Sequence, residues 1–385
     1  MTKTHSGAGK AALVIGHVAG MIDLVALPLW VDTLILGYKY SPAQAGALPT
    51  LFLIGAVIAS VVLSRRFHAI NGRGLVPLGF AIAAVSFFVV TKTDSYVVRA
   101  GLHLLSGIAA GTSVSIIHGT MGKTDQPHRV FAMAGIGLGL FAILFLGGMP
   151  QIITAVGPQA FFYGIGGTMA IAAVVTAALM PSKAVEVHAL EGIDALPLSV
   201  KYAIVGVMGM ALVQGMVFSF LVQVGNARGF GSSNVEIVLI VLGFISLSAP
   251  VLAAFLEKRL SAMTVARVGP VVQAAFATAI MTAPVYLGYA VPAVFFAAVM
   301  IFTHTFVFGF MARQDPTGRA VAATPAIVMS GAAIGPFLGG ALVELSGYPA
   351  IGIAAIVIAV VCIVMFTNAD RTARAGGTAA GAIAN

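Results

Sequence analysis

The first apolar run of the sequence, residues 11–36, carries an acidic residue, Asp23, close to its midpoint. An α-helix rises about 1.5 Å per residue and about 20 apolar residues cross a bilayer core, so this run can span a membrane. Asp23 would then lie near the centre, where an acid costs about 2.5–3.5 kcal/mol on insertion scales and usually faces a bundle interior or a hydrated cavity. We interpret Asp23 as a candidate proton or substrate site. The alternative is a neutral, hydrogen-bonded acid that joins two helices.

Deep ionisable or amide side chains occur mainly on three more apolar runs, as His103, Gln214 and His304, and the other spans offer chiefly hydroxyls, with Gln273 in the ninth. Because lipid satisfies no hydrogen bond, we expect these three residues to share one hydrated site with Asp23, and Trp30 to be a further binding residue there. For His103, a hydrogen bond to substrate and proton transfer are both open. His304 stands among phenylalanines, so a histidine that only packs in the core is an equal alternative there.

The composition indicates which elements must position these residues. Of the 385 residues, 59% are hydrophobic and only 8% are charged, and the mean hydropathy is +1.05. A soluble domain carries about 25% charged residues, and long apolar runs favour helices over the alternating strands of a barrel. The single cysteine excludes a disulfide framework and a cysteine metal site. We predict an all-α membrane protein with twelve transmembrane helices, near residues 11–35, 43–64, 75–92, 96–120, 130–153, 159–181, 199–224, 235–256, 265–284, 290–312, 320–344 and 348–367.

The charges predict the orientation of these helices. Most of the 20 lysine and arginine residues fall on the side of the N-terminus, and only four fall elsewhere: Lys39, Lys92, Arg99 and Arg228. By the positive-inside rule both termini are cytoplasmic. The net charge of +8 therefore reflects topology and predicts no nucleic-acid partner. Asp32, Glu236 and Glu344 fall at outer span ends, where we expect them to meet solvent.

The two halves of the chain repeat. A shift of 190 residues maps Lys123, Asp125 and Arg129 onto Arg313, Asp315 and Arg319, and maps Gly157 and Ala160 onto Gly347 and Ala350. Several matches in one register favour duplication over chance. We therefore expect two six-helix bundles related by a pseudo-two-fold axis, residues 1–181 and 199–369. A polar cytoplasmic linker, 182–198, would join them, and residues 370–385 would form an unstructured tail.

With these features the sequence resembles the major facilitator superfamily over nearly its whole length. The segment Gly331-x-x-x-Gly335-Pro336-x-x-Gly339-Gly340 is similar to that family's glycine–proline helix motif. The segment His103-Leu104-Leu105-Ser106-Gly107 is similar to its R-x-x-Q-G motif, with histidine in place of arginine. The resemblance implies that the first, fourth, seventh and tenth spans line a central cavity, and that the protein lies in a bacterial cytoplasmic (inner) membrane.

The family's loop between the second and third spans typically reads G-x-x-x-D-R-x-G-R-R, and here Ser64 takes the place of the acid and only Arg65 is in register. We therefore expect the repeated charges to contribute to a cytoplasmic gate, as ion pairs that form in one state and break in the other. Solvated, snorkelling charges are the alternative. The candidate gate residues are Arg65, Lys123, Asp125, Arg129, Arg313, Asp315 and Arg319.

These observations predict a secondary transporter that moves a small organic solute by alternating access, with protonation of Asp23 coupled to substrate occupancy. No lysine or arginine reaches mid-membrane, which disfavours phosphate and dicarboxylate substrates. An alternative is efflux of drugs or hydrophobic cations by proton antiport, with Asp23 as the cation's partner. A membrane-embedded enzyme is a third hypothesis, but the sequence lacks the H-E-x-x-H, G-x-S-x-G and Walker motifs. We expect no catalytic residues, no cofactor and no metal, and a monomer in the lipid bilayer with the solute and protons as partners.

Overall fold

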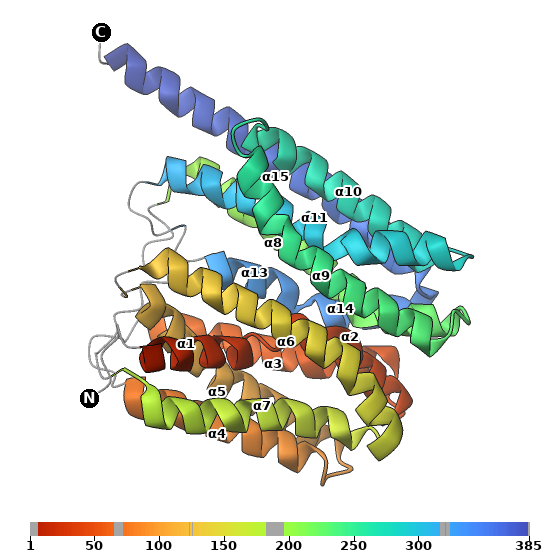
Figure 1. The fold of residues 1–385 in the computed structure, drawn as a ribbon. Helices are drawn as coiled ribbons and strands as arrows, with labels where there is room; N and C mark the ends of the chain where they lie inside the picture. The colour runs from red at the N-terminus through yellow and green to blue at the C-terminus, as the bar shows by residue number, and fades with distance from the viewer. Residues whose placement is uncertain are drawn as a thin grey trace.

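The computed structural model describes residues 7–64, 72–122, 124, 126–181, 196–315, 320 and 324–383. Within them the chain is helical and contains no strand (Figure 1). Twelve of its helical segments are long and apolar enough to cross a membrane, so the predicted spans are confirmed over the described residues.

The first six spans form one bundle, which we call the N-bundle. Its helices are α1 (Gly7–Gly20), α2 (Asp23–Leu36), α3 (Pro42–Ser64), α4 (Gly72–Val90), α5 (Tyr96–Gly122), α6 (Pro127–Val156) and α7 (Gln159–Leu179). The first span is divided between α1 and α2. Within this bundle α3 packs on α5, and α4 packs on both α5 and α7.

The last six spans form the C-bundle. Its helices are α8 (Leu198–Ala227), α9 (Ser232–Leu256), α10 (Ala262–Thr282), α11 (Tyr286–Gln314), α13 (Thr324–Ala333), α14 (Gly335–Ser346) and α15 (Pro349–Ile383). Here α9 packs on α11, and α10 packs on both α11 and α15, which repeats the helix pairs of the N-bundle. The eleventh span is divided between α13 and α14, one residue before the first glycine and proline of α14.

The duplication is visible in the backbone. Helices α6 and α14 both end on a glycine with positive φ, Gly157 at +107° and Gly347 at +74°, a conformation that side-chain-bearing residues rarely adopt. The Gly157 N–H donates to the Ile153 carbonyl at 2.8 Å, and the Gly347 N–H donates to the Val343 carbonyl at 2.9 Å. The same residues recur at a shift of 190 with the same hydrogen bonds, as the sequence predicts.

The two bundles meet at their outer ends, meaning the span ends opposite the N-terminus. Across this side Gln223 Nε2 donates to Asp32 Oδ1 at 2.9 Å. Glu344 Oε2 accepts from the Ser41 hydroxyl at 2.8 Å and from the Ala43 N–H at 3.1 Å. Asp32 is half-buried between the bundles, where Gln223 of the other bundle holds it, so it meets solvent only in part.

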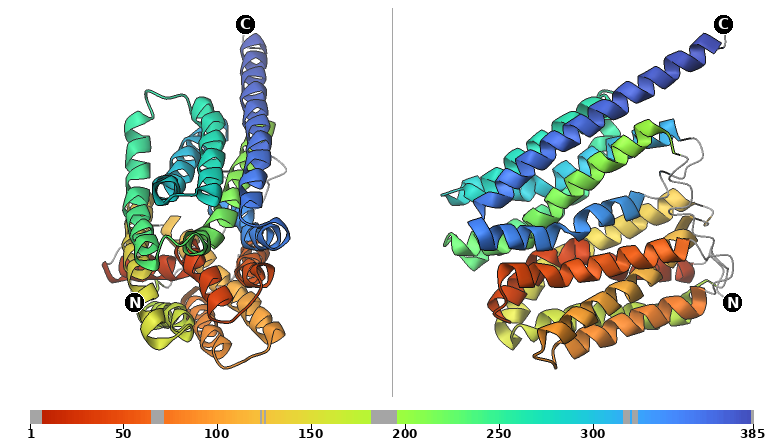
Figure 2. Two further views of the ribbon diagram at one scale, coloured as in Figure 1. Left: turned by 90° about the vertical axis from the view of Figure 1, so that its right-hand side faces the viewer. Right: turned by 180° about the vertical axis from the view of Figure 1, so that it is seen from behind.

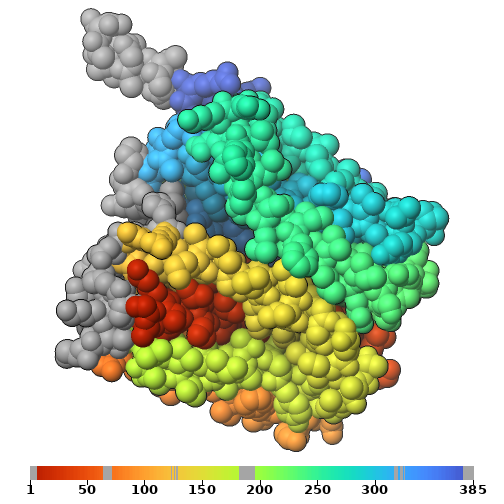
Figure 3. Space-filling view, in the orientation of Figure 1, coloured from red at the N-terminus to blue at the C-terminus, as the bar shows by residue number. Residues whose placement is uncertain are grey.

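The inner ends of the bundles diverge. Helix α2 packs against α8, whereas α1, the inner half of the same span, packs against α5, α6 and α7 of its own bundle. Figures 1 and 2 show the bundles spreading apart toward the side of the N-terminus. Figure 3 shows a hollow on that side between α6 (yellow) and the C-bundle, with blue C-bundle atoms on its floor. The structure is therefore closed at the outer ends and open at the inner ends.

The last helix, α15, extends further than the sequence analysis expects. It continues to Ile383, through residues 370–383 of the tail predicted to be unstructured, and projects beyond the bundle in Figure 2. The segment is rich in alanine, which has the highest helix propensity. An ion pair holds its first residues against the bundle. Asp370 binds Arg267 of α10 and also Arg374 of α15, whose Nε lies 3.0 Å from Oδ1.

Candidate functional site

Polar groups buried without a partner mark the candidate site. Among the described residues, four buried side-chain atoms lack a hydrogen-bond partner: Asp23 Oδ1, Gln214 Oε1, His304 Nδ1 and Arg267 Nε. Buried polar groups in folded proteins are nearly always hydrogen-bonded, so each exception needs a reason. Three of these four belong to the set predicted from the sequence, on the first, seventh and tenth spans.

Asp23 lies where the first span is interrupted. The Met21 N–H donates to the His17 carbonyl at 2.9 Å, but the next N–H, that of Ile22, reaches only Ala19 at 3.4 Å, and Leu24 bonds to Met21 at 3.2 Å. The helix therefore breaks after α1 and restarts with Asp23 as the first residue of α2. The Asp23 side chain is 3% exposed, so it does not point at acyl chains. Interrupted helices at membrane depth are where transporters bind solutes and ions.

Gln214 occupies the equivalent position in the C-bundle. The hydrogen bond between Asp32 and Gln223 joins residues 191 apart in the sequence, and the same shift relates Asp23 to Gln214. Each of these two lies about 13 Å inward of that hydrogen bond along its own helix, at about 1.5 Å per residue. Asp23 and Gln214 are therefore at matching depths in the two bundles.

His304 lies on the helix that packs beside Gln214. Helices α8 and α11 run antiparallel: the Phe218 and Phe296 rings are 6.0 Å apart, and further outward the Tyr289 hydroxyl donates to the Leu221 carbonyl at 3.0 Å. Inward of that ring pair, Gln214 follows after about one helical turn and His304 after about two. The two side chains thus differ in depth by about one turn, or about 6 Å.

The His304 ring stacks on Phe308, with centroids 4.9 Å apart and planes at 29°. Its Nδ1 is nevertheless buried without a partner. A histidine that serves only to pack has no need of a nitrogen left unsatisfied, because an apolar ring would fill the space at lower cost. This observation favours the binding interpretation of His304 over the packing one.

His103 and Trp30 contact each other, but they do not belong to the group of unpartnered residues formed by Asp23, Gln214 and His304. Both are fully buried. His103 Nε2 accepts from Trp30 Nε1 at 3.2 Å, and its Nδ1–H donates to the Arg99 carbonyl at 2.7 Å. The Phe87 and Phe162 rings close around His103 at 5.8 Å each. Every hydrogen-bonding atom of the imidazole is used by the protein itself, so in this conformation His103 and Trp30 form the packed core of the N-bundle.

The predicted gate residues are only partly visible. Arg65, Lys123, Asp125 and Arg319 lie outside the described residues. Arg129 and Arg313 are exposed at the inner ends, where one Arg129 Nη lies 3.4 Å from Gln126 Oε1. Asp315 is buried and accepts from the Ala320 N–H at 2.9 Å. Inner-end ion pairs between the bundles stay a prediction for the state in which these ends close.

Sequence reasoning missed the contact between Asp32 and Gln223, although a signal for it was present. Applying the shift between the two halves of the chain to every polar residue would have paired Asp32 with Gln223. Residues related by the pseudo-two-fold axis meet where their helices cross that axis. His17 Nδ1 and His118 Nε2 lie 2.8 Å apart, but both belong to the N-bundle, so this pair does not bridge the two bundles.

No protein-family model and no curated protein matches the sequence. Solved structures share its fold. The nucleoside transporter NupG has a TM-score of 0.70 at 16% identity, over 95% of this chain and 99% of that one. A bacterial homolog of the human lysosomal transporter Spinster, inward-facing and occupied, has a TM-score of 0.68 at 13% identity, over 97% and 98%. The xylose transporter XylE from E. coli, partially occluded and inward open, has a TM-score of 0.66 at 13% identity, over 92% and 96%.

Proposed function

We propose that this chain, which has the major facilitator fold, is a secondary active transporter that moves a small organic solute by alternating access. The observation that carries the proposal is the set of unpartnered polar atoms on Asp23, Gln214 and His304. They lie on the first, seventh and tenth spans. Asp23 and Gln214 lie at matching depths, and Gln214 and His304 differ in depth by about one helical turn. A solute bound between the bundles would supply the missing hydrogen bonds.

The chemistry of these three groups indicates the solute class. Gln214 Oε1 accepts a hydrogen bond, and His304 Nδ1 accepts or donates according to its tautomer. No guanidinium or ammonium group belongs to the set, so a multiply charged anion would find no clamp. A neutral or zwitterionic solute with hydroxyl, amide or amino groups meets these requirements. A hydrophobic cation exported in exchange for protons is the second candidate, because the Asp23 carboxylate would also neutralise it.

Coupling to protons follows from the position of Asp23. A buried carboxylate with one oxygen left without a partner is costly, so it gains by binding a proton or a cationic group of the solute. In the closed-outside, open-inside arrangement we infer that the solute and the proton exchange with the inner side. Closing the inner ends would then bring the gate charges together and separate Asp32 from Gln223.

We further infer a monomer in a bacterial cytoplasmic membrane with both termini inside. The halves 1–181 and 199–369 would move as units about the linker 182–198. Support comes from the basic residues concentrated at the inner ends and from the inner divergence of the bundles. Reporter fusions at each terminus, scored for cytoplasmic against external location, test the orientation.

Transport in proteoliposomes tests the function. A thermal-shift screen of small metabolites on the purified protein identifies a solute, because a ligand stabilises by mass action and should do so less in Gln214→Ala. Uptake of that solute under an imposed pH gradient is then measured for the wild type and Asp23→Asn. We expect Asp23→Asn to bind and exchange the solute but not to accumulate it. Glu236→Gln, which removes an acid at an outer end, is the control and should accumulate normally. Full accumulation by Asp23→Asn would refute the coupling role.

A further inference from the structure

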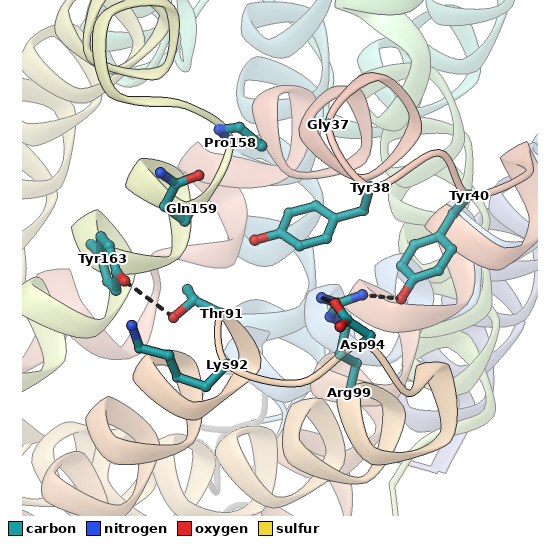
Figure 4. Close-up of a pocket in the computed structure, with 10 residues that line it drawn as sticks. All are labelled: Gly37, Tyr38, Tyr40, Thr91, Lys92, Asp94, Arg99, Pro158, Gln159 and Tyr163. Atoms are coloured by element: carbon teal, nitrogen blue, oxygen red, sulfur yellow. Dashed lines mark hydrogen bonds and ion pairs between the residues drawn. The ribbon is translucent and has the colours of Figure 1, made fainter.

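The outer end of the N-bundle contains a pocket of ≈ 660 Å³. Its walls come from the three outer connections of that bundle, between α2 and α3, between α4 and α5, and between α6 and α7, and from the first turns of α5 and α7 (Figure 4). All of its lining residues belong to the N-bundle, and none is among the three candidate transport residues. The pocket is therefore separate from the space between the bundles, and filling it requires no movement of one bundle against the other.

A buried arginine fixes one wall of the pocket. The Arg99 side chain is 6% exposed, its Nε donates to the Val90 carbonyl at 3.2 Å, and one Nη donates to the Tyr40 hydroxyl at 2.5 Å. Its guanidinium carbon lies 4.4 Å from the centroid of the Tyr38 ring and 5.7 Å from that of Tyr40. Arg99 thus holds both tyrosines in place and supplies a permanent positive charge beside them.

Hydrogen-bond donors face the open space of the pocket. The Tyr38 hydroxyl has no partner among the described residues and points across the pocket toward Tyr163 in Figure 4. Burial raises the pKa of Tyr38, against the opposing effect of Arg99, so the phenol keeps its proton. The Lys92 amine lies on the opposite wall beside Tyr163, whose hydroxyl is 3.4 Å from Thr91 Oγ1. A cation and two phenols therefore converge on one space.

The charge of the lining selects the kind of ligand. Lys92 and Arg99 are opposed by one acid, Asp94, which lies 3.7 Å from Arg99, so the lining carries one net positive charge. One negative charge on a ligand would neutralise it. A phosphate dianion prefers a free guanidinium fork, and here the fork is committed to Val90, Tyr40 and Asp94. The tyrosine rings add an apolar surface that inorganic anions cannot use.

We propose that this pocket is a second binding site, open to the outer side, for a small organic monocarboxylate. Its carboxylate would bind the Lys92 amine and the Tyr38 hydroxyl, and its body would lie against the Tyr38 ring. Because the pocket lies within one bundle, this site would be occupied in every stage of alternating access.

Calorimetric titration of the purified full-length protein with benzoate tests the proposal. We expect saturable binding to the wild type, at least about tenfold weaker binding to Lys92→Gln because a charge-assisted hydrogen bond is lost, and a smaller loss in Tyr38→Phe. Lys39→Gln is the matched control: it removes the same charge from an exposed residue of the same outer side that does not line the pocket, and should bind as the wild type does. The fluorescence of Trp30, the single tryptophan, verifies that each variant keeps its N-bundle core.

Several outcomes would overturn the proposal. These are no benzoate binding by the wild type, equal binding by Lys92→Gln, or tighter binding of inorganic phosphate or of the neutral polyol xylitol than of benzoate. Benzoate binding must also persist in Asp23→Asn. Its loss there would mean that the probe occupies the space between the bundles, which would overturn this inference and leave the proposed transport function standing.

Discussion

The hydrogen bond between Asp32 and Gln223 should hold the outer ends of the bundles together. It joins the two bundles at 2.9 Å with both residues at least half-buried. A hydrogen bond to a charged group contributes about 1.5–3 kcal/mol, and partial exposure favours the lower value. Because the bond exists only while the outer ends are closed, its whole free energy acts on the closed–open equilibrium. Asp32→Ala or Gln223→Ala should therefore shift that equilibrium toward the outer-open state about tenfold.

Spin labels on the outer ends of α5 and α11 can measure this shift. Val97 and Leu287 occupy equivalent positions in the two bundles and are 77% and 69% exposed, and the single native cysteine, Cys362, is buried and can be replaced. Double electron–electron resonance between labels at these two positions should show a longer distance in each alanine variant than in the parent.

Combining the two alanine substitutions tests whether the effect belongs to the pair. The double variant should behave like either single variant, since each already removes the bond. Glu236→Ala removes another outer acid, on α9, and should leave the distance distribution unchanged. If both single variants keep the parent distribution, or if their effects add in the double variant, this hydrogen bond does not hold the outer ends together.

Further predictions follow from other contacts. A side chain at Gly46 would meet the Pro336 carbonyl of α14, since an added Cβ would lie 2.0 Å from its oxygen, so Gly46→Val should lengthen the same outer distance. His103→Leu leaves the Trp30 N–H buried without an acceptor, at a cost of about 1–3 kcal/mol, and should lower the unfolding temperature followed by Trp30 fluorescence. Asp23→Asn removes the formal charge from a buried group with one oxygen left without a partner, so it should raise the unfolding temperature in the same measurement.

The twelve spans were predictable because they depend on local hydropathy, and the duplication was predictable because charged and glycine positions repeat in register. The grouping of Asp23, Gln214 and His304 rested on which spans carry deep polar residues. The structure agrees to the extent that each of these side chains, on three of those spans, has a buried polar atom without a hydrogen-bond partner. Depth along a helix is readable from the sequence, because each residue advances the chain by a fixed rise.

The rotation of each helix about its own axis, which decides where its side chains point, was not predictable in the same way. His103 and Trp30 have the depth and polarity of cavity residues, yet α5 is rotated so that His103 meets the Trp30 N–H and the phenylalanine rings inside the N-bundle. That rotation depends on packing between helices far apart in the sequence. Asp32 likewise looked like a solvent-facing acid at a span end, because its partner Gln223 stands in the other half of the chain.

The duplication gives the two bundles equivalent positions but not equivalent chemistry. Besides the basic pair Lys10 and Lys201, the shift of 191 relates two polar pairs of the first and seventh spans. In both, the acid stands in the N-bundle and the amide in the C-bundle: Asp23 against Gln214, and Asp32 against Gln223. An amide offers hydrogen bonds at every pH, whereas an acid changes its charge when it binds a proton. Under the proposed function, proton binding therefore acts on the first span, at the helix break and at the outer contact. The C-bundle then contributes a neutral surface whose hydrogen bonds distinguish one solute from another.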